Sequence, residues 1–167
     1  MTLVIGCGNT DRGDDGAGIL VARRLRDLGV DAIEHSGDGL ALLDLWNPDD
    51  EVILIDAVVS GKKPGIVSIW DPIHRPLAVE SFRSSTHSFG PWEAIELARA
   101  LDRLPKRIEI HAIEAANFEP GAEPCRPVLA AVGRVVENIA LTLRSSSQPP
   151  ERAPNAPSQP PFSRPAL

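Results

Sequence analysis

The sequence predicts an α/β domain: a mostly parallel, twisted sheet of about five strands with helices on both faces, in three layers. Short apolar runs bounded by turn residues, such as Val52–Ile55, are typical of strands buried on both faces of such a sheet. These runs alternate with segments of helical periodicity, which indicates βαβ connections. The 167 residues are 43% hydrophobic, enough for one core of ordinary domain size.

The first strand is expected at Leu3–Ile5, an apolar run that leads into a glycine-rich loop. From Ala17 to Leu28 apolar residues recur at helical spacing, with arginines on the other face, and Gly29 stands where a helix C-cap belongs. The segments that follow are predicted to be a strand at Val30–Ile33, a brief helix at Leu40–Trp46 and a strand at Val52–Ile55.

A second helix of ordinary length is expected to begin near Pro91 and to end before Pro105. Ser88 is its expected N-cap, because a serine oxygen can accept from the free amides of the first turn. The other segments are predicted to be a turn at Gly61–Gly65, a strand at Ile66–Trp70, an irregular connection from Pro72 to Thr86, a strand at Ile108–Ile113 and a helix over Val128–Leu143.

The chain is expected to form one domain over residues 1–144, followed by a disordered tail over residues 145–167. The tail holds seven of the chain's 16 prolines. It offers little apolar surface to offset the entropy of ordering. A role as a linker or recognition segment is the alternative.

Composition narrows the class of partner. The net charge is -6 without a basic stripe, which argues against nucleic acid. No apolar run approaches the roughly 20 residues of a membrane span, and no signal segment precedes the first strand. Cys7 and Cys125 have no metal or disulfide spacing, which suits a reducing compartment. We therefore expect a soluble, cytoplasmic protein whose partner is a protein or a small molecule. We also expect it to be a monomer.

The glycine-rich loop from Gly6 to Gly18 fails both phosphate-binding patterns. A dinucleotide fingerprint needs a third glycine at position 11, which is Asp11. A P-loop needs lysine after Gly13, where the chain has Asp14. With Asp15, the loop carries three carboxylates that would repel a phosphate and attract a cation. It indicates a site for a metal or a proton.

Three polar residues fall at the edge of the predicted sheet where ligands of open α/β folds collect. Asp15 follows the first strand, Asp56 follows Val52–Ile55, and His87 precedes a helix. Two carboxylates and an imidazole suit a borderline divalent ion such as nickel, zinc or manganese. Each also has a structural interpretation. Asp56 could be a turn or cap residue, and His87 could lie in a surface loop. Asp14 or Asp15 could stabilise the N-terminus of the first helix, and we expect Asp14 to do so.

The remaining histidines and the cysteines do not extend this candidate site. His111 alternates within a strand and is expected to be structural, His74 lies between prolines and is expected to be exposed, and His35 lacks such a setting. The chain has no HExxH sequence and no Gly-x-Ser-x-Gly elbow. No Cys/His motif promotes either cysteine to a nucleophile.

Three motifs resemble those of the nickel-iron hydrogenase maturation endopeptidases, over roughly residues 1–144. They are Gly6-x-Gly8-Asn9-x-x-x-x-Asp14-Asp15-Gly16-x-Gly18, Asp56-Ala57, and Thr86-His87 before a helix. The resemblance implies removal of a C-terminal extension from the hydrogenase large-subunit precursor after nickel insertion. It implies Asp15, Asp56 and His87 as metal ligands. The ion would be the nickel that the precursor carries, with zinc or cadmium as substitutes in vitro.

One loop departs from the family pattern. Where the family usually has Asp-Gly-Gly/Thr-Thr, this chain has Ser36-Gly37-Asp38-Gly39, which puts substrate choice in doubt. On the endopeptidase hypothesis, Asp15 or Asp38 handles protons. A second hypothesis is a chaperone-like module that binds the immature large subunit without cutting it. A third, nucleotide binding, requires the loop to hold phosphate despite its acids.

Overall fold

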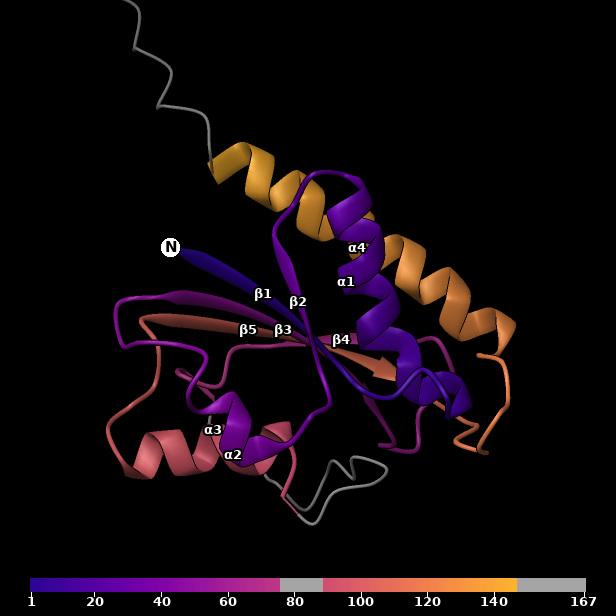
Figure 1. The fold of residues 1–167 in the computed structure, drawn as a ribbon, viewed down its shortest axis with the longest axis horizontal. Coiled ribbons are helices and arrows are strands. Elements are labelled where there is room, and N and C mark those ends of the chain that lie inside the picture. Colours follow the sequence, from indigo (N-terminus) through magenta and orange to yellow (C-terminus); the bar gives the residue numbers. More distant parts are fainter. Residues whose placement is uncertain (76–88, 147–167) are drawn as a thin grey trace, which may run out of the picture.

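The computed structural model describes residues 1–75 and 89–146. Its centre is a five-stranded sheet in the order β2-β1-β3-β5-β4, in which β4 alone runs antiparallel to its neighbour (Figure 1). The strands are β1 Thr2–Cys7, β2 Ala32–His35, β3 Glu51–Val58, β4 Val67–Trp70 and β5 Arg107–Glu114. The helices are the 3-10 helix η1 Gly13–Gly16, α1 Ala17–Asp27, α2 Gly39–Leu42, α3 Pro91–Ala100 and α4 Arg126–Ser146.

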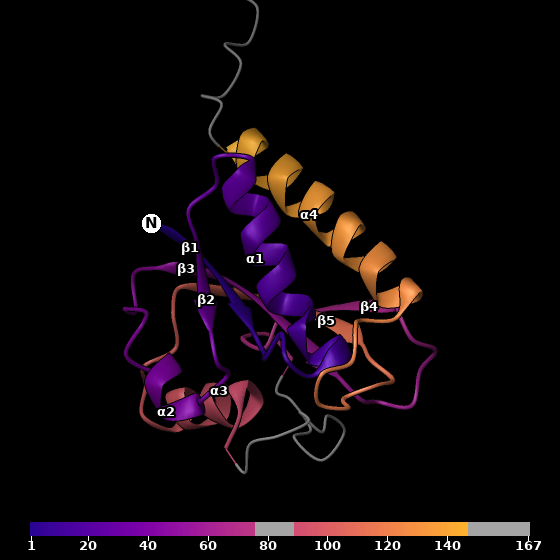
Figure 2. The same cartoon turned by 45° about the vertical axis from the view of Figure 1, so that its right-hand side comes forward.

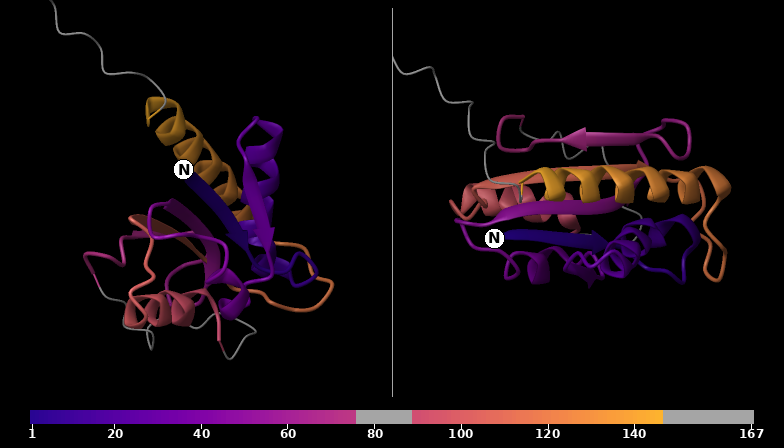
Figure 3. Two further views of the ribbon diagram at one scale, coloured as in Figure 1. Left: turned by 60° about the vertical axis from the view of Figure 1, so that its left-hand side comes forward. Right: turned by 90° about the horizontal axis from the view of Figure 1, so that it is seen from above.

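Helices cover both faces of the sheet. Helices α1 and α4 lie side by side on one face, and α2 and α3 cover the other (Figures 1 and 2). Figure 3 shows from above that β4 lies along one edge of the sheet. Each face has its own apolar cluster, with Ile113 and Val132 in one and Ile110 and Trp92 in the other. The predicted three-layer α/β fold is confirmed.

Some predicted boundaries were wrong for local reasons. Val30 belongs to the end of α1, because its amide bonds to Leu25 O at 3.0 Å beside Gly29 with φ +81°, a Schellman-type C-cap. Helix α2 is shorter than Leu40–Trp46 and starts at Gly39. The N-cap of α3 is Gly90 rather than Ser88, and the Gly90 amide donates to Glu93 Oε2 at 2.9 Å. Ser88, like the predicted connection at 76–86, lies outside the described residues.

Helix α4 continues to Ser146, so it includes the first two residues of the predicted tail, which was expected to start at residue 145. The rest of the predicted tail, residues 147–167, lies outside the described residues. None of the described helices combines the length and apolar character needed to cross a membrane.

Close packing of α1 on the sheet sets the position of the glycine-rich loop. A Cβ on Gly18 would lie 2.3 Å from Cys7 O and 2.5 Å from Ile55 O, and one on Gly6 would lie 2.1 Å from Gly18 O. Only glycine allows the helix to approach β1 and β3 this closely. The N-terminus of α1, and η1 before it, therefore sit directly over the carboxyl ends of these two strands.

Candidate active site

Two of the predicted ligands lie at neighbouring strand ends. Strands β1 and β3 pair in parallel with Gly6 opposite Ile55, so Asp56 lies beside the point where β1 enters the glycine-rich loop. Asp56 is within β3 rather than after it, since the strand continues to Val58. Asp15 is in η1, just before α1. Both acids are buried, with 5% of Asp15 and 4% of Asp56 exposed.

Asp56 is an unusual buried acid. Its Oδ2 atom has no hydrogen-bond partner among the described residues. Burial, and next the negative charge of Asp15, raise the pKa of Asp56 from 3.8 to about 7. The effect of Asp15 places the two carboxylates within electrostatic reach of each other. A bound cation would offset both the burial of charge and this repulsion.

The backbone of the glycine-rich loop fixes Asp15. The Asn9 amide donates to Asp15 O at 3.3 Å, and the Asp15 amide donates to Arg12 O at 3.2 Å. Gly8 has φ +134°, and a Cβ there would lie 1.8 Å from Asp15 O. The glycines of the motif therefore let the loop fold back on itself and bury an acid.

Asp14 does not serve α1, contrary to the prediction. Its buried carboxylate accepts from the amides of Ala116 and Asn117 at 2.9 Å and of Cys125 at 2.7 Å, and from Cys125 Sγ at 3.4 Å. Helix α1 has no side-chain cap bond at its N-terminus. Burial opposes the charge of Asp14, yet the three backbone bonds hold its pKa below the usual value. Asp14 thus ties the loop after β5 to the loop that carries Asp15.

The third predicted ligand, His87, lies outside the described residues. Within residues 1–75 and 89–146 no group of three or more His, Cys, Asp or Glu residues could hold a metal. The described part of the chain thus brings Asp15 and Asp56 together. The charge of Glu93 on α3 also raises the pKa of Asp56, after burial and Asp15.

The loop that departs from the family pattern packs against the segment leading into α3. The Gly39 amide donates to Phe89 O at 3.1 Å, and a Cβ on Gly39 would lie 2.5 Å from the Phe89 ring. Asp38 is the N-cap of α2, accepting from the Ala41 amide at 2.9 Å. The sequence signal for this role is an Asp just before an apolar helical run.

The other histidines behave as expected. His111 is buried in β5, with Nε2 2.7 Å from Glu109 Oε1, and His74 is exposed beside Asp71. His35 accepts a hydrogen bond from the Gly37 amide at 3.0 Å, and burial lowers its pKa. Cys7 and Cys125 are both free thiols.

A family model described as hydrogenase maturation protease matches residues 21–142. The chain belongs to this family. Membership makes it a hydrolase of peptide bonds that acts in hydrogenase maturation.

Relatives across bacteria and archaea agree with the hydrogenase maturation protease family. Protein FrxA of Pyrococcus furiosus is 32% identical over 136 residues, which cover 79% of this chain and 97% of that protein. Hydrogenase expression/formation protein HupD of Rhizobium leguminosarum bv. viciae is 26% identical over 150 residues, which cover 86% of this chain and 74% of HupD.

Solved structures share the fold. The NiFe hydrogenase maturation protease HybD from Thermococcus kodakarensis has a TM-score of 0.67 at 32% identity, and the match covers 85% of this chain and 97% of HybD. The hydrogenase maturating endopeptidase HybD from E. coli has a TM-score of 0.72 at 24% identity, covering 87% of this chain and 93% of that one. The second match bears on the fold alone.

Proposed function

We propose that this protein is a nickel-dependent endopeptidase that removes the C-terminal extension of a nickel-iron hydrogenase large-subunit precursor after nickel insertion. The observation that carries the proposal is the pair of buried carboxylates, Asp15 and Asp56, at the carboxyl ends of adjacent parallel strands. The unpartnered Oδ2 of Asp56 is a buried acceptor that suits a cation.

The nickel in the proposal is part of the substrate, carried by the precursor. Asp15, Asp56 and His87 would hold it, because carboxylate oxygens and an imidazole nitrogen are ligands that suit nickel or zinc. Zinc or cadmium would serve as substitutes in vitro. Bound there, the ion would polarise the scissile carbonyl or the attacking water.

The protein's own groups would position the scissile bond and move protons. Asp15 and Asp56 are mostly shielded from water, so their charges act strongly on a docked substrate. A carboxylate, Asp15 or Asp38, would take a proton from the attacking water and deliver it to the leaving amine. Asp15 is favoured because its charge acts directly on Asp56, whereas Asp38 is exposed and already caps α2.

The test compares nickel-loaded and nickel-free precursor, each mixed with this protein, with loss of the extension followed by mass spectrometry. We expect cleavage of the loaded form alone, so that the protease acts as a checkpoint on nickel insertion. Equal cleavage of both forms would exclude nickel dependence. A stable complex that keeps the extension would instead identify a binding module.

A further inference from the structure

Strand β2 is one edge of the sheet, and its backbone shows which groups face outward. The Gly8 amide donates to His35 O at 3.0 Å, so His35 faces β1. Backbone groups of successive strand residues point to opposite sides, so Ala32 and Glu34 face the open edge. Arg26 Nη1 confirms this orientation by donating to Ala32 O at 3.2 Å.

The Arg26 side chain covers the open edge of β2 only at Ala32, the first residue of the strand. Further along, the side chain of Glu34 turns back to α1, where its Oε2 accepts from Arg23 Nη2 at 2.9 Å and its Oε1 accepts from Arg26. No strand of the described chain pairs with the outward backbone groups of Glu34. An N–H and a C=O at the carboxyl end of β2 therefore remain available to an extended segment.

A hollow of about 400 Å³ with polar and apolar walls opens beside this end of β2. Its walls include Gly8, Asn9 and Thr10 from the loop after β1, Arg23 from α1, and Glu34 and His35 from β2. The same loop carries Asp15, to whose carbonyl Asn9 donates. The hollow thus adjoins the candidate active site.

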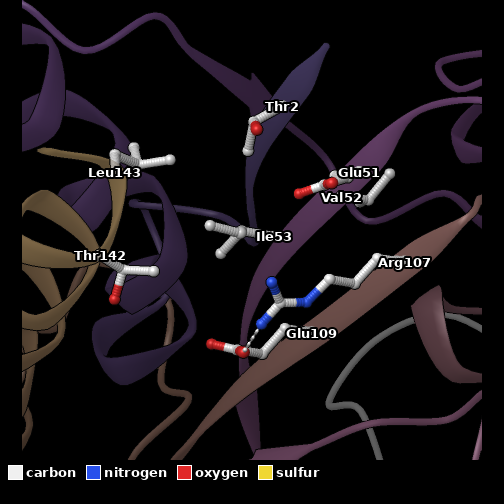
Figure 4. Close-up of a pocket in the computed structure, with 8 residues that line it drawn as sticks. All are labelled: Thr2, Glu51, Val52, Ile53, Arg107, Glu109, Thr142 and Leu143. Carbon is white, nitrogen blue, oxygen red and sulfur yellow. Dashed lines mark hydrogen bonds and ion pairs between the residues drawn. The ribbon is translucent and has the colours of Figure 1, made fainter. Parts of the chain in front are cut away.

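Two other hollows among the described residues lie at the other end of the sheet. One of about 300 Å³ is lined by Ile69, Trp70 and Asp71 beyond the end of β4. Another, of about 20 Å³, lies between the amino ends of β1, β3 and β5 and the end of α4, beside the ion pair of Arg107 and Glu109 (Figure 4). It has room for about one water molecule. Neither adjoins Asp15 or Asp56.

We propose that the free edge of β2 at Glu34 binds the precursor segment around the scissile bond as an added β-strand, with one of its side chains in the hollow beside β2. This inference rests on the proposed function. Strand addition gives affinity through main-chain hydrogen bonds, and a side-chain hollow gives specificity. A segment held along β2 would lie beside Gly8, Asn9 and Thr10, which belong to the loop that presents Asp15. The Arg23–Glu34 pair in the wall suits a polar or charged side chain.

The test compares Glu34→Pro with Glu34→Ala on nickel-loaded precursor. Both variants lose the ion pairs with α1, and only the proline removes the outward N–H, while pairing with β1 is kept. We expect KM for Glu34→Pro to exceed that of Glu34→Ala by about tenfold, the value of roughly one hydrogen bond, with kcat within about twofold. Equal KM values in two folded variants would overturn the inference.

A second measurement does not depend on how the variant folds. The wild-type protein is held in complex with nickel-loaded precursor whose scissile peptide link is replaced by an uncleavable aminomethylene link that keeps its N–H, and amide exchange is compared with the free protein. We expect the Glu34 amide to exchange at least about tenfold more slowly. Unchanged exchange at Glu34 in a complex that co-elutes overturns the edge site.

The two proposals can fail separately. If wild-type protein does not shorten ordinary nickel-loaded precursor, the endopeptidase proposal fails, whereas protection of Glu34 in the complex would still support the edge site. If cleavage occurs and Glu34 is neither protected nor sensitive to proline, only the edge site fails.

Discussion

This molecule contains two kinds of buried acid, which differ in their hydrogen bonds. Asp14 and Glu114 are 0% and 2% exposed and are surrounded by donors: Glu114 accepts from the amides of Ser60, Gly61 and Lys62 and from the Ser60 hydroxyl. Asp56 is as deeply buried, yet one of its oxygens has no partner among the described residues. Asp14 ties two loops together and Glu114 ties a loop to β5, whereas the unsatisfied acid suits a ligand from outside.

The largest effect should come from neutralising the unsatisfied acid. Asp56→Asn keeps the shape of the side chain and removes a ligand charge, so we expect cleavage of nickel-loaded precursor to fall at least about a thousandfold while the fold is kept. Asp15→Asn should do the same. Cleavage rates by mass spectrometry and circular dichroism check this, with the exposed Asp44→Asn as the control that keeps full activity. Active Asp15 and Asp56 variants would assign both acids a structural role.

Neutralising Asp56 should also change how stability depends on pH. The pKa of Asp56 is raised to about 7 in the folded protein, so the carboxyl stabilises the fold fully below about pH 4, and this stabilisation is lost as pH rises through 7. The Asp56→Asn variant does not lose stability in this way, because its amide does not ionise. From about pH 4 to 8, the variant should gain on the order of 4 kcal/mol of unfolding free energy relative to wild type.

Urea unfolding of both proteins across this pH range, with a chelator present, measures the difference. If the unfolding free energies of the two proteins changed with pH in the same way, ionisation of Asp56 would not destabilise the fold. Together with lost cleavage, a gain in stability at pH 8 would mark Asp56 as an acid kept for function at a cost to the fold.

Local sequence patterns located the elements of this fold well, because burial on both faces of a sheet imposes continuous apolar runs. Val52–Ile55 and Ile108–Ile113 both lie inside the strands they predicted, β3 and β5. Boundaries set by hydrogen bonds were less visible. Val30, apolar like a strand residue, closes the end of α1 because its amide reaches Leu25 O.

Pairing between distant loops was the least predictable feature of the candidate site. Asp14 and Asp15 are adjacent and chemically identical, so spacing alone could not assign different roles to them. Their difference arises from amides more than 100 positions away, such as that of Ala116, which local patterns cannot detect. The sequence identified the acids of the loop but not which one would bond to the loop after β5.

The satisfied acid provides the smallest of these effects. Asp14→Ala leaves the amides of Ala116, Asn117 and Cys125 without their acceptor, so we expect the unfolding free energy at pH 7 to drop by about 3 kcal/mol. Asp11→Ala in the same loop removes an exposed acid and should change it by less than about 0.5 kcal/mol. Urea unfolding compares the two. Because the partners of Asp14 lie within the chain, Asp14→Ala should unfold at a lower urea concentration than wild type. Asp56→Asn should instead lose cleavage with no loss of stability. An Asp14 variant as stable as wild type would show that the loop after β5 does not need this carboxylate, and the contrast between the two kinds of buried acid would fail.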